Sequence, residues 1–103
     1  MAMVMLFSVT AFANEVSWYE GSAYCTGSIS RTSATTTAGL PMYVEAVVRC
    51  QYYLAGELDE THEESRNTGT NVTAYATIPS GGDVLKTEGA HRAGNGMYHF
   101  TKY

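Results

Sequence analysis

The residues of this sequence best suited to recognising a ligand are tyrosines, amides and a threonine that alternate with apolar residues. They occupy the odd positions of two segments, 42–54 and 70–78. An amphipathic ring beside amides and hydroxyls offers both contact area and hydrogen bonds, which suits recognition of glycans or proteins. Such rings also pack across neighbouring strands merely to support a sheet, which is the alternative. The candidate binding residues are Tyr43, Gln51, Tyr53, Asn71, Thr73 and Tyr75.

The densest charge in the chain lies between residues 57 and 64. Carboxylates gathered there would suit calcium, but the spacing lacks the glycine that an EF-hand loop needs at its sixth position. His62 also begins a pattern like a zinc-protease motif, yet the residue four positions later is Arg66. We favour a solvated hairpin connection whose charges prevent edge pairing, and we assign no metal ligand. The acidic residues of this run are Glu57, Asp59, Glu60, Glu63 and Glu64.

Two histidines flank the reversal at residues 94–96, Gly-Asn-Gly. A three-residue loop places His91 opposite His99, where two imidazoles suit zinc or copper. A two-residue loop places Arg92 opposite His99 instead and abolishes the pair. Because no third ligand is near in the sequence, we interpret both histidines as ordinary polar strand residues.

No arrangement of residues predicts catalysis. A hydrolytic nucleophile needs a positioned base, and none of the many Ser and Thr residues occupies a Gly-x-Ser-x-Gly elbow. No glycine-rich phosphate loop precedes a helix. Residues 71–73 match a glycosylation sequon, but inside an expected strand. We therefore expect a protein that is not an enzyme and that uses no cofactor.

Residues 1–13 are uncharged and consist mainly of Met, Val, Leu, Phe and Ala. They end in Ala-Phe-Ala, a small-x-small pattern that suits signal peptidase, so we interpret them as a secretory signal. The basic region that usually begins a signal is missing, which indicates a true start upstream of Met1. A short buried segment of the mature domain is the alternative. The apolar run is shorter than the roughly 20 residues that a membrane-spanning helix needs, so no stable membrane insertion is expected.

Export makes a disulfide the expected state of the two cysteines. Cys25 and Cys50 lie in strand-like segments, and a bridge would close a loop of about 26 residues. In the chain-entropy model that closure contributes about 3 to 4 kcal/mol, a large share of a small domain's stability. In a cytosolic protein the same pair would be reduced and merely buried.

Alternating polarity predicts the strands that position these residues. The even positions of 42–54 carry no charge, which predicts a long strand, preceded by Pro41, with one buried face and one mostly wet face. Residues 70–78 alternate as clearly. We also expect one strand over 16–26, bent or bulged at Gly21, a weaker strand over 84–92 and, after a tight reversal, another over 97–103. The Thr- and Ser-rich run 31–39 is either a solvated loop or a polar edge strand.

These strands predict an all-β chain in which residues 14–103 form one small antiparallel β-sandwich, with a small closed β-barrel as the alternative. A length of 103 residues is enough for one domain. The hydrophobic content of 45% excludes intrinsic disorder. A net charge of -4 without any basic cluster excludes a nucleic-acid binder that tracks phosphates.

The last third of the chain resembles short exported proteins of Gram-positive bacteria. The likeness runs from Asn71 through Ala90-His91-Arg92 to Tyr98-His99-Phe100-Thr101, and these proteins share a Thr/Ser/Ala-rich strand, an Ala-His pair and an aromatic C-terminus. A fainter similarity is to lactococcin 972-type bacteriocins, exported β-sandwiches of comparable size. That similarity implies killing through interference with cell-wall synthesis. Those bacteriocins need no cysteine pair, and none of their residues can be carried over.

Two functions are consistent with these observations. The first is a secreted or surface-associated binding module whose tyrosine-rich face recognises a cell-wall glycan, another surface glycan or a protein. The second is a bacteriocin-like antibacterial protein. Retention on glycan without killing would favour the first, and growth inhibition would favour the second.

Overall fold

The computed structural model describes residues 14–103, and the predicted signal segment lies outside the described residues. Strands make up 77% of these residues and no helix occurs among them, so the all-β prediction is confirmed. In particular, the described chain has no helix that could cross a bilayer. The six strands are β1 (Glu15–Glu20), β2 (Ala23–Ile29), β3 (Ser33–Leu54), β4 (Glu57–Tyr75), β5 (Asp83–Ala93) and β6 (His99–Lys102).

All six strands belong to one antiparallel sheet built around β3. The order along the sheet is β1-β2-β3-β5-β6, and β4 pairs with β3 on its other side. The first half of β3 pairs with β2 and the second half with β5, while β4 follows β3 along both halves. The Thr- and Ser-rich run is therefore an interior strand, neither a loop nor an edge.

A bend divides β3 into these halves. The ladder between β3 and β4 shifts register between Thr37 and Met42, where Pro41 interrupts the pairing. Proline has no N–H to donate, so it is accommodated where the ladder is irregular. The sequence indicated Pro41 as the residue before the long strand, but the strand begins earlier, at Ser33.

Two tight turns also differ from the sequence-based expectation. Gly21, with a φ of 63°, lies in a reversal between β1 and β2, so the expected bent strand is a hairpin. Ala55 and Gly56, with φ values of 53° and 81°, reverse the chain between β3 and β4. Positive φ at both central residues is what a two-residue hairpin turn requires. The acidic run therefore starts a strand at once instead of forming a loop.

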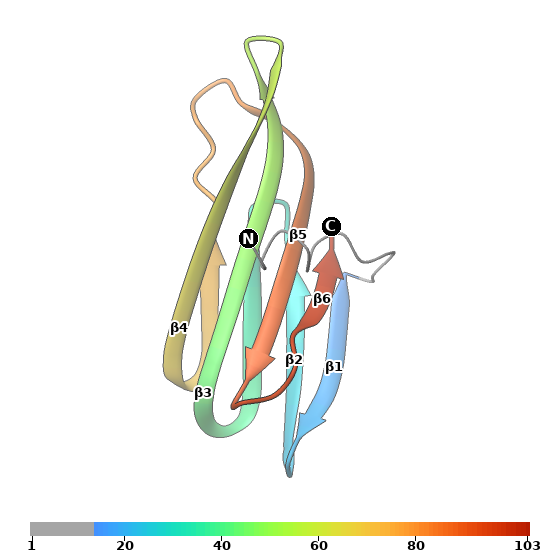
Figure 1. Cartoon of the computed structure of the whole chain (residues 1–103), viewed down its shortest axis with the longest axis vertical. Helices are drawn as coiled ribbons and strands as arrows, with labels where there is room; N and C mark the ends of the chain where they lie inside the picture. Colours follow the sequence, from blue (N-terminus) through green and yellow to red (C-terminus); the bar gives the residue numbers. More distant parts are fainter. Residues whose placement is uncertain (1–13) are drawn as a thin grey trace.

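The sheet curls until it is nearly closed and barrel-like. In Figure 1, β3 and β4 turn back at the bend, so that their other halves lie behind with β2. The outer strands β1 and β6 come into contact, and the Trp18 and His99 rings stack there with centroids 4.0 Å apart. The molecule measures 47 × 25 × 24 Å, and the β3–β4 hairpin forms one end of its long axis (Figure 1).

The core lies between the front and rear halves of this curled sheet. Val44, Ala46 and Val48 are fully buried, as the alternation in β3 predicts. They belong to one apolar cluster with residues of β2, the first half of β3, the second half of β4 and the end of β5. The bend thus creates the core by folding β3 over itself. The other fully or largely buried members are Ala23, Cys25, Ala34, Ala38, Val72, Ala74 and Ala93.

The predicted disulfide is wrong. Cys25 and Cys50 are both buried, as the alternation indicated, but their thiols are free and not near each other. Cys25 pairs with Ala38 at the bend, whereas Cys50 lies much farther along β3, with its Sγ 3.4 Å from Thr87 Oγ1. The alternation fixes which face a residue occupies, but not its position along a strand that doubles back.

Candidate functional site

The six predicted binding residues lie on two separate parts of the outer surface. One group lies on the second half of β3, whose neighbours are β5 and the first half of β4. The other lies at the end of β4, opposite Ser33, Thr35 and Thr37 in the first half of β3. The bend thus separates two groups that were expected on one face. The first group is Tyr43, Gln51 and Tyr53, and the second is Asn71, Thr73 and Tyr75.

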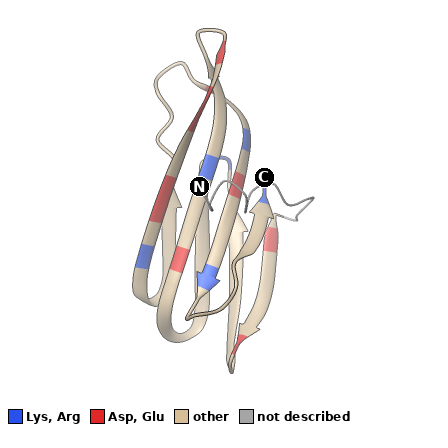
Figure 2. Cartoon of the chain, viewed as in Figure 1, with Lys and Arg blue, Asp and Glu red and all other residues tan. Residues whose placement is uncertain are grey.

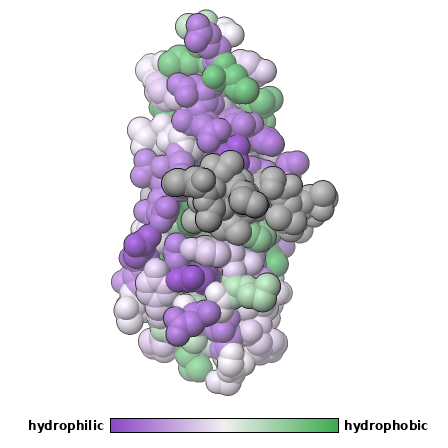
Figure 3. All heavy atoms as spheres, viewed as in Figure 1, coloured by the Kyte–Doolittle hydropathy of each residue, from purple (hydrophilic) through white to green (hydrophobic). Residues whose placement is uncertain are grey.

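The first group belongs to a surface that we call the charged face, the outer side of β5, the second half of β3 and the first half of β4. Across these strands Arg49 lies between His62 and Glu88. Figure 2 shows acidic and basic residues along all three strands, and Figure 3 shows mainly hydrophilic atoms over the same region. Opposite charges in neighbouring strands compensate one another, so this face is a ladder of ion pairs.

A buried carboxylate organises the lower part of the charged face. Glu45 is only 3% exposed. Its Oε2 accepts a hydrogen bond from the Tyr98 hydroxyl at 2.9 Å, and its Oε1 accepts one from the Tyr43 hydroxyl at 3.2 Å. Arg92 Nε lies 3.5 Å from Oε1, and its guanidinium covers both tyrosine rings. Burial and the bond to Glu45 raise the pKa of Tyr98 to about 12. Tyr43 is therefore already engaged within the protein.

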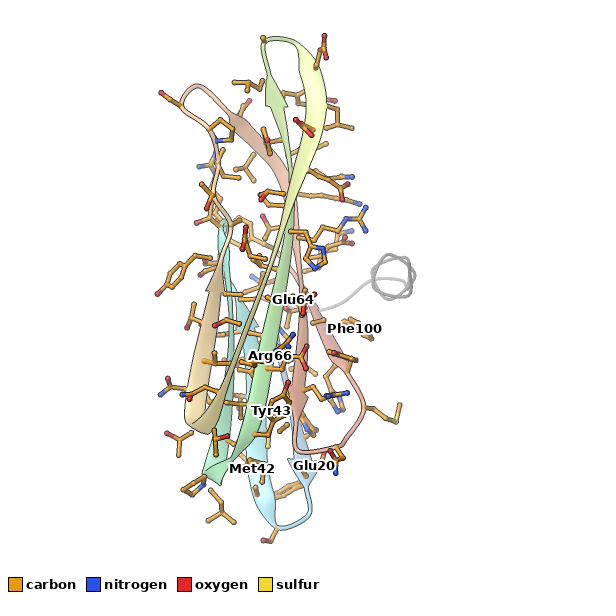
Figure 4. The ribbon with its side chains drawn as sticks, turned by 60° about the vertical axis from the view of Figure 1, so that its left-hand side comes forward. Glu20, Met42, Tyr43, Glu64, Arg66 and Phe100 are labelled. Atoms are coloured by element: carbon orange, nitrogen blue, oxygen red, sulfur yellow. The ribbon has the colours of Figure 1, made fainter. Side chains whose placement is uncertain are left out.

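The expectation that this face of β3 is mostly wet is wrong for two residues, Glu45 and Val47. Val47 is fully buried and forms a small apolar cluster with Ala90, against which Tyr98 and Phe100 pack. In Figure 4, Tyr43, Arg66 and Glu64 follow one another along this face, with Phe100 beside them. The C-terminal segment covers the strand here, a tertiary contact that alternation within one strand does not reveal.

The acidic side chains of β4 do not gather at one point, because they project to both sides of the strand. Glu60 and Glu64 point to the charged face, where Arg49 Nε lies 3.3 Å from Glu60 and Arg66 donates to Glu64 at 2.6 Å. Successive side chains of a strand alternate sides, so Glu63 projects the other way, as do Glu57 and Asp59. Within residues 14–103, no three His, Cys, Asp or Glu side chains are grouped as a metal site would require.

The two histidines are opposite each other, in the register expected for a three-residue loop. His91 is fully buried, with Nδ1 2.9 Å from Thr36 Oγ1 and Nε2 2.7 Å from Thr101 Oγ1. The Thr36 hydroxyl donates to the Glu45 carbonyl, so it accepts from Nδ1–H, and Nε2 accepts from Thr101. His91 is thus held neutral as a hydrogen-bonded core residue, while His99 stacks on Trp18.

The second group of predicted residues belongs to a different surface, which we call the uncharged face. It is the outer side of β1, β2, the first half of β3 and the second half of β4. Residues 23–29, 33–44 and 67–82 contain no charged side chain, and Figure 2 shows the strands behind the charged face in tan, apart from β1. One row of side chains across the strands is Ser17, Thr26, Thr37 and Asn71, and the next is Glu15, Ser28, Thr35 and Thr73. Glu15, at one end of the second row, carries a charge.

Four threonine hydroxyls on the uncharged face are held by bonds to one another. The Thr26 and Thr37 hydroxyls bond to each other, and those of Thr35 and Thr73 lie 2.8 Å apart. Neighbouring strands are about 4.8 Å apart, so the hydroxyls repeat regularly across the sheet. Exposed rings lie at its two ends: Tyr75 at one, 69% exposed, and a Tyr19–Tyr24 edge-to-face pair at the other.

The sequence pattern of the first half of β3 is ambiguous between a loop and a strand. Ser33, Thr35 and Thr37 alternate with Ala34 and Ala38, the period of a strand with one small-residue side. Threonine, however, occurs on both sides of this strand, since Thr36 is fully buried beside His91. Polarity alone therefore does not indicate which side of this segment faces the core.

Comparison of the chain with protein-family models, with curated proteins and with solved structures gave no match.

Proposed function

We propose that this protein is a secreted, non-catalytic binding module that recognises an uncharged, hydroxyl-rich glycan, such as a cell-wall polysaccharide, through the uncharged face. The observation that carries the proposal is a sheet face with ordered rows of hydroxyls, an almost complete lack of charge and exposed tyrosine rings at both ends. The opposite side of the molecule is, by contrast, dense in charge.

The chemistry of this face matches that of a neutral sugar polymer. Each hydroxyl both donates and accepts hydrogen bonds, which is what ring hydroxyls of a sugar also do. An aromatic ring such as Tyr75 offers a flat apolar surface with a polar tip. Thr26 and Thr35 are already held by neighbouring hydroxyls, so little side-chain freedom is lost when a ligand binds. A repeating array of hydroxyls suits a repeating ligand.

The proposal retains three of the six predicted binding residues. Asn71, Thr73 and Tyr75 lie on the uncharged face, whereas Tyr43 bonds to Glu45 on the other face. Tyr53 is 45% exposed and is separated from Tyr75 by the bend. Secretion is part of the proposal, and the signal-like residues 1–13 support it.

We also infer that the curled sheet is better described as a sandwich than as a closed barrel. The support is that, within residues 14–103, β1 and β6 meet through side chains such as Trp18 and His99 and share no ladder. Fast amide exchange on the facing edges of both strands is expected, while slow exchange on both would indicate closure.

Binding is tested by depletion of purified protein on insoluble neutral polysaccharides, including bacterial cell walls. Tyr75→Ala is expected to weaken retention about fivefold, because a lost ring contact is worth roughly 1 kcal/mol. Tyr53→Ala is the matched control, since it removes an exposed tyrosine from the charged face. Retention that Tyr53→Ala weakens equally, or no retention at all, would overturn the proposal. Growth inhibition of Gram-positive cells by the purified protein would point to the bacteriocin alternative.

A further inference from the structure

We propose that the second half of β4, residues 67–75, pairs antiparallel with the same segment of a second copy of this chain, and so joins two uncharged faces into one. The open side of this strand and its lack of charge support the pairing itself. Its consequence for binding rests on the proposed function.

β4 is a long strand with one open side. It spans 19 residues, and among residues 14–103 it pairs only with β3. The side of an edge strand that faces away from its neighbour presents a row of backbone N–H and C=O groups, which is a template for another strand. Proteins usually protect such edges with charged side chains, prolines or bulges.

The two halves of β4 differ in that protection. The first half is rich in carboxylates, and Glu57, Asp59 and Glu63 project to the side facing the core, which opposes pairing with any further strand. The second half, residues 67–75, contains neither charge nor proline. Asn67 Nδ2 makes a long bond of 3.4 Å to the Asn71 carbonyl, which a partner strand can replace. The strand is thus protected in one half and open in the other.

A second copy is the partner that fits this edge best. Antiparallel pairing of identical strands around a two-fold axis near Val72 satisfies both open edges at once. Gly69 lies opposite the end of the register shift of β3, and the acidic first half of β4 lies beyond it. Because the two strands are antiparallel, their acidic halves extend away from the axis in opposite directions. Each segment is already ordered as a strand, so pairing costs little conformational entropy. Val72, which is 8% exposed at this edge, would also be covered.

Such a dimer doubles the proposed binding surface. Because the axis is perpendicular to the sheet, the rows that end at Asn71 and Thr73 continue into the rows of the partner. Eight strands then present hydroxyls on one side. Two linked faces on one polymer bind with an avidity above that of either face alone.

The oligomeric state tests the pairing directly and without any glycan. Sedimentation equilibrium of the purified protein is expected to show a monomer–dimer equilibrium. Asn71→Lys places two like charges at the junction and is expected to raise the dissociation constant at least about tenfold. Ser17→Lys is the matched control, since it adds the same charge at the other end of the same row, and it should leave the dimer intact. Equal effects of both substitutions would overturn the inference.

Cross-linking gives a second, independent measurement. An equimolar mixture of Asn71→Cys and Thr73→Cys is expected to form an intermolecular disulfide on mild oxidation, because an axis near Val72 places residue 71 opposite residue 73 of the second copy. A mixture of Ser17→Cys and Thr73→Cys is not expected to form one, and the two native thiols are fully buried. A protein that stays monomeric at every concentration and forms no such cross-link contradicts the pairing. Glycan retention by that monomer would still support the proposed function. A dimer without retention would contradict only the proposed function.

Discussion

Acidification is expected to weaken the fold through His91. Burial, and then the charge of His99, lower the pKa of His91 from its ordinary value of 6.5 to about 4. The ring is fully buried, and its two nitrogens are bonded to Thr36 and Thr101 in the neutral form. A proton therefore binds the unfolded chain more readily than the folded one. Stability is complete above pH 6.5 and is lost as the pH falls from 6.5 towards 4.

The size of this loss follows from the two pKa values. Each pKa unit between the folded and unfolded states corresponds to about 1.4 kcal/mol, so the full effect is about 3 kcal/mol. At pH 5, where the unfolded His91 is almost fully charged and the folded one is mostly neutral, about 2 kcal/mol is already lost. For a domain of this size, that is a substantial part of a total free energy of unfolding of about 5 to 15 kcal/mol.

Urea unfolding at pH 7.5, 6.0 and 5.0 measures the effect. Carboxylates also titrate in this range, so the informative quantity is the difference in pH dependence between the wild type and His91→Gln, which cannot take up a proton. His62→Gln, which makes the same change at an exposed position, is the control for the substitution itself. If His91→Gln loses stability between pH 7.5 and 5.0 as steeply as the wild type, the reasoning is refuted.

Three further predictions concern the core, the thiols and the C-terminal cover. Gly27→Ala would place its Cβ in a steric clash with Cγ of His91, so a loss of about 1 to 3 kcal/mol in unfolding free energy is expected. An unchanged urea midpoint would contradict that contact. Cys25 and Cys50 should resist a thiol reagent in the native protein, since both are buried and burial raises the pKa of Cys25. Both should react after unfolding without reductant, and a need for reductant would show that they form a disulfide. The phenol of Tyr98 should ionise near pH 12, so its neutral form stabilises the fold up to pH 10 and this contribution is lost as the pH rises towards 12. The measurement is a phenolate difference spectrum against Tyr98→Phe. Ionisation near pH 10 would contradict the contact of Tyr98 with the buried carboxylate of Glu45.

Alternation along single segments predicted the strand class and the inner face of the long strand correctly. Val44, Val48 and Cys50 are buried because side chains of a strand alternate, and that rule needs no tertiary information. For the two histidines the sequence leaves two registers open, and the structure has the one that belongs to a three-residue loop. These successes share one feature: each depends on residues close together in the sequence.

The errors arise where distant segments meet or where the strand bends. Glu45 and Val47 were expected to be wet, but a C-terminal segment far along the chain covers them. The signal-like segment and the even number of cysteines predict a bridge between Cys25 and Cys50, but the bend beside Pro41 separates the two residues. The same bend divides the predicted binding residues between the two outer faces. Alternating polarity along a strand gives no indication of such a bend.

The most direct test of binding through the uncharged face is an NMR titration of the labelled protein with a soluble neutral oligosaccharide prepared from a retained polysaccharide. The amide signals of Thr26, Thr37, Thr73 and Tyr75 are expected to shift together and to saturate at one dissociation constant. Shifts centred instead on Glu45 and its neighbours, or an unchanged spectrum, would contradict it.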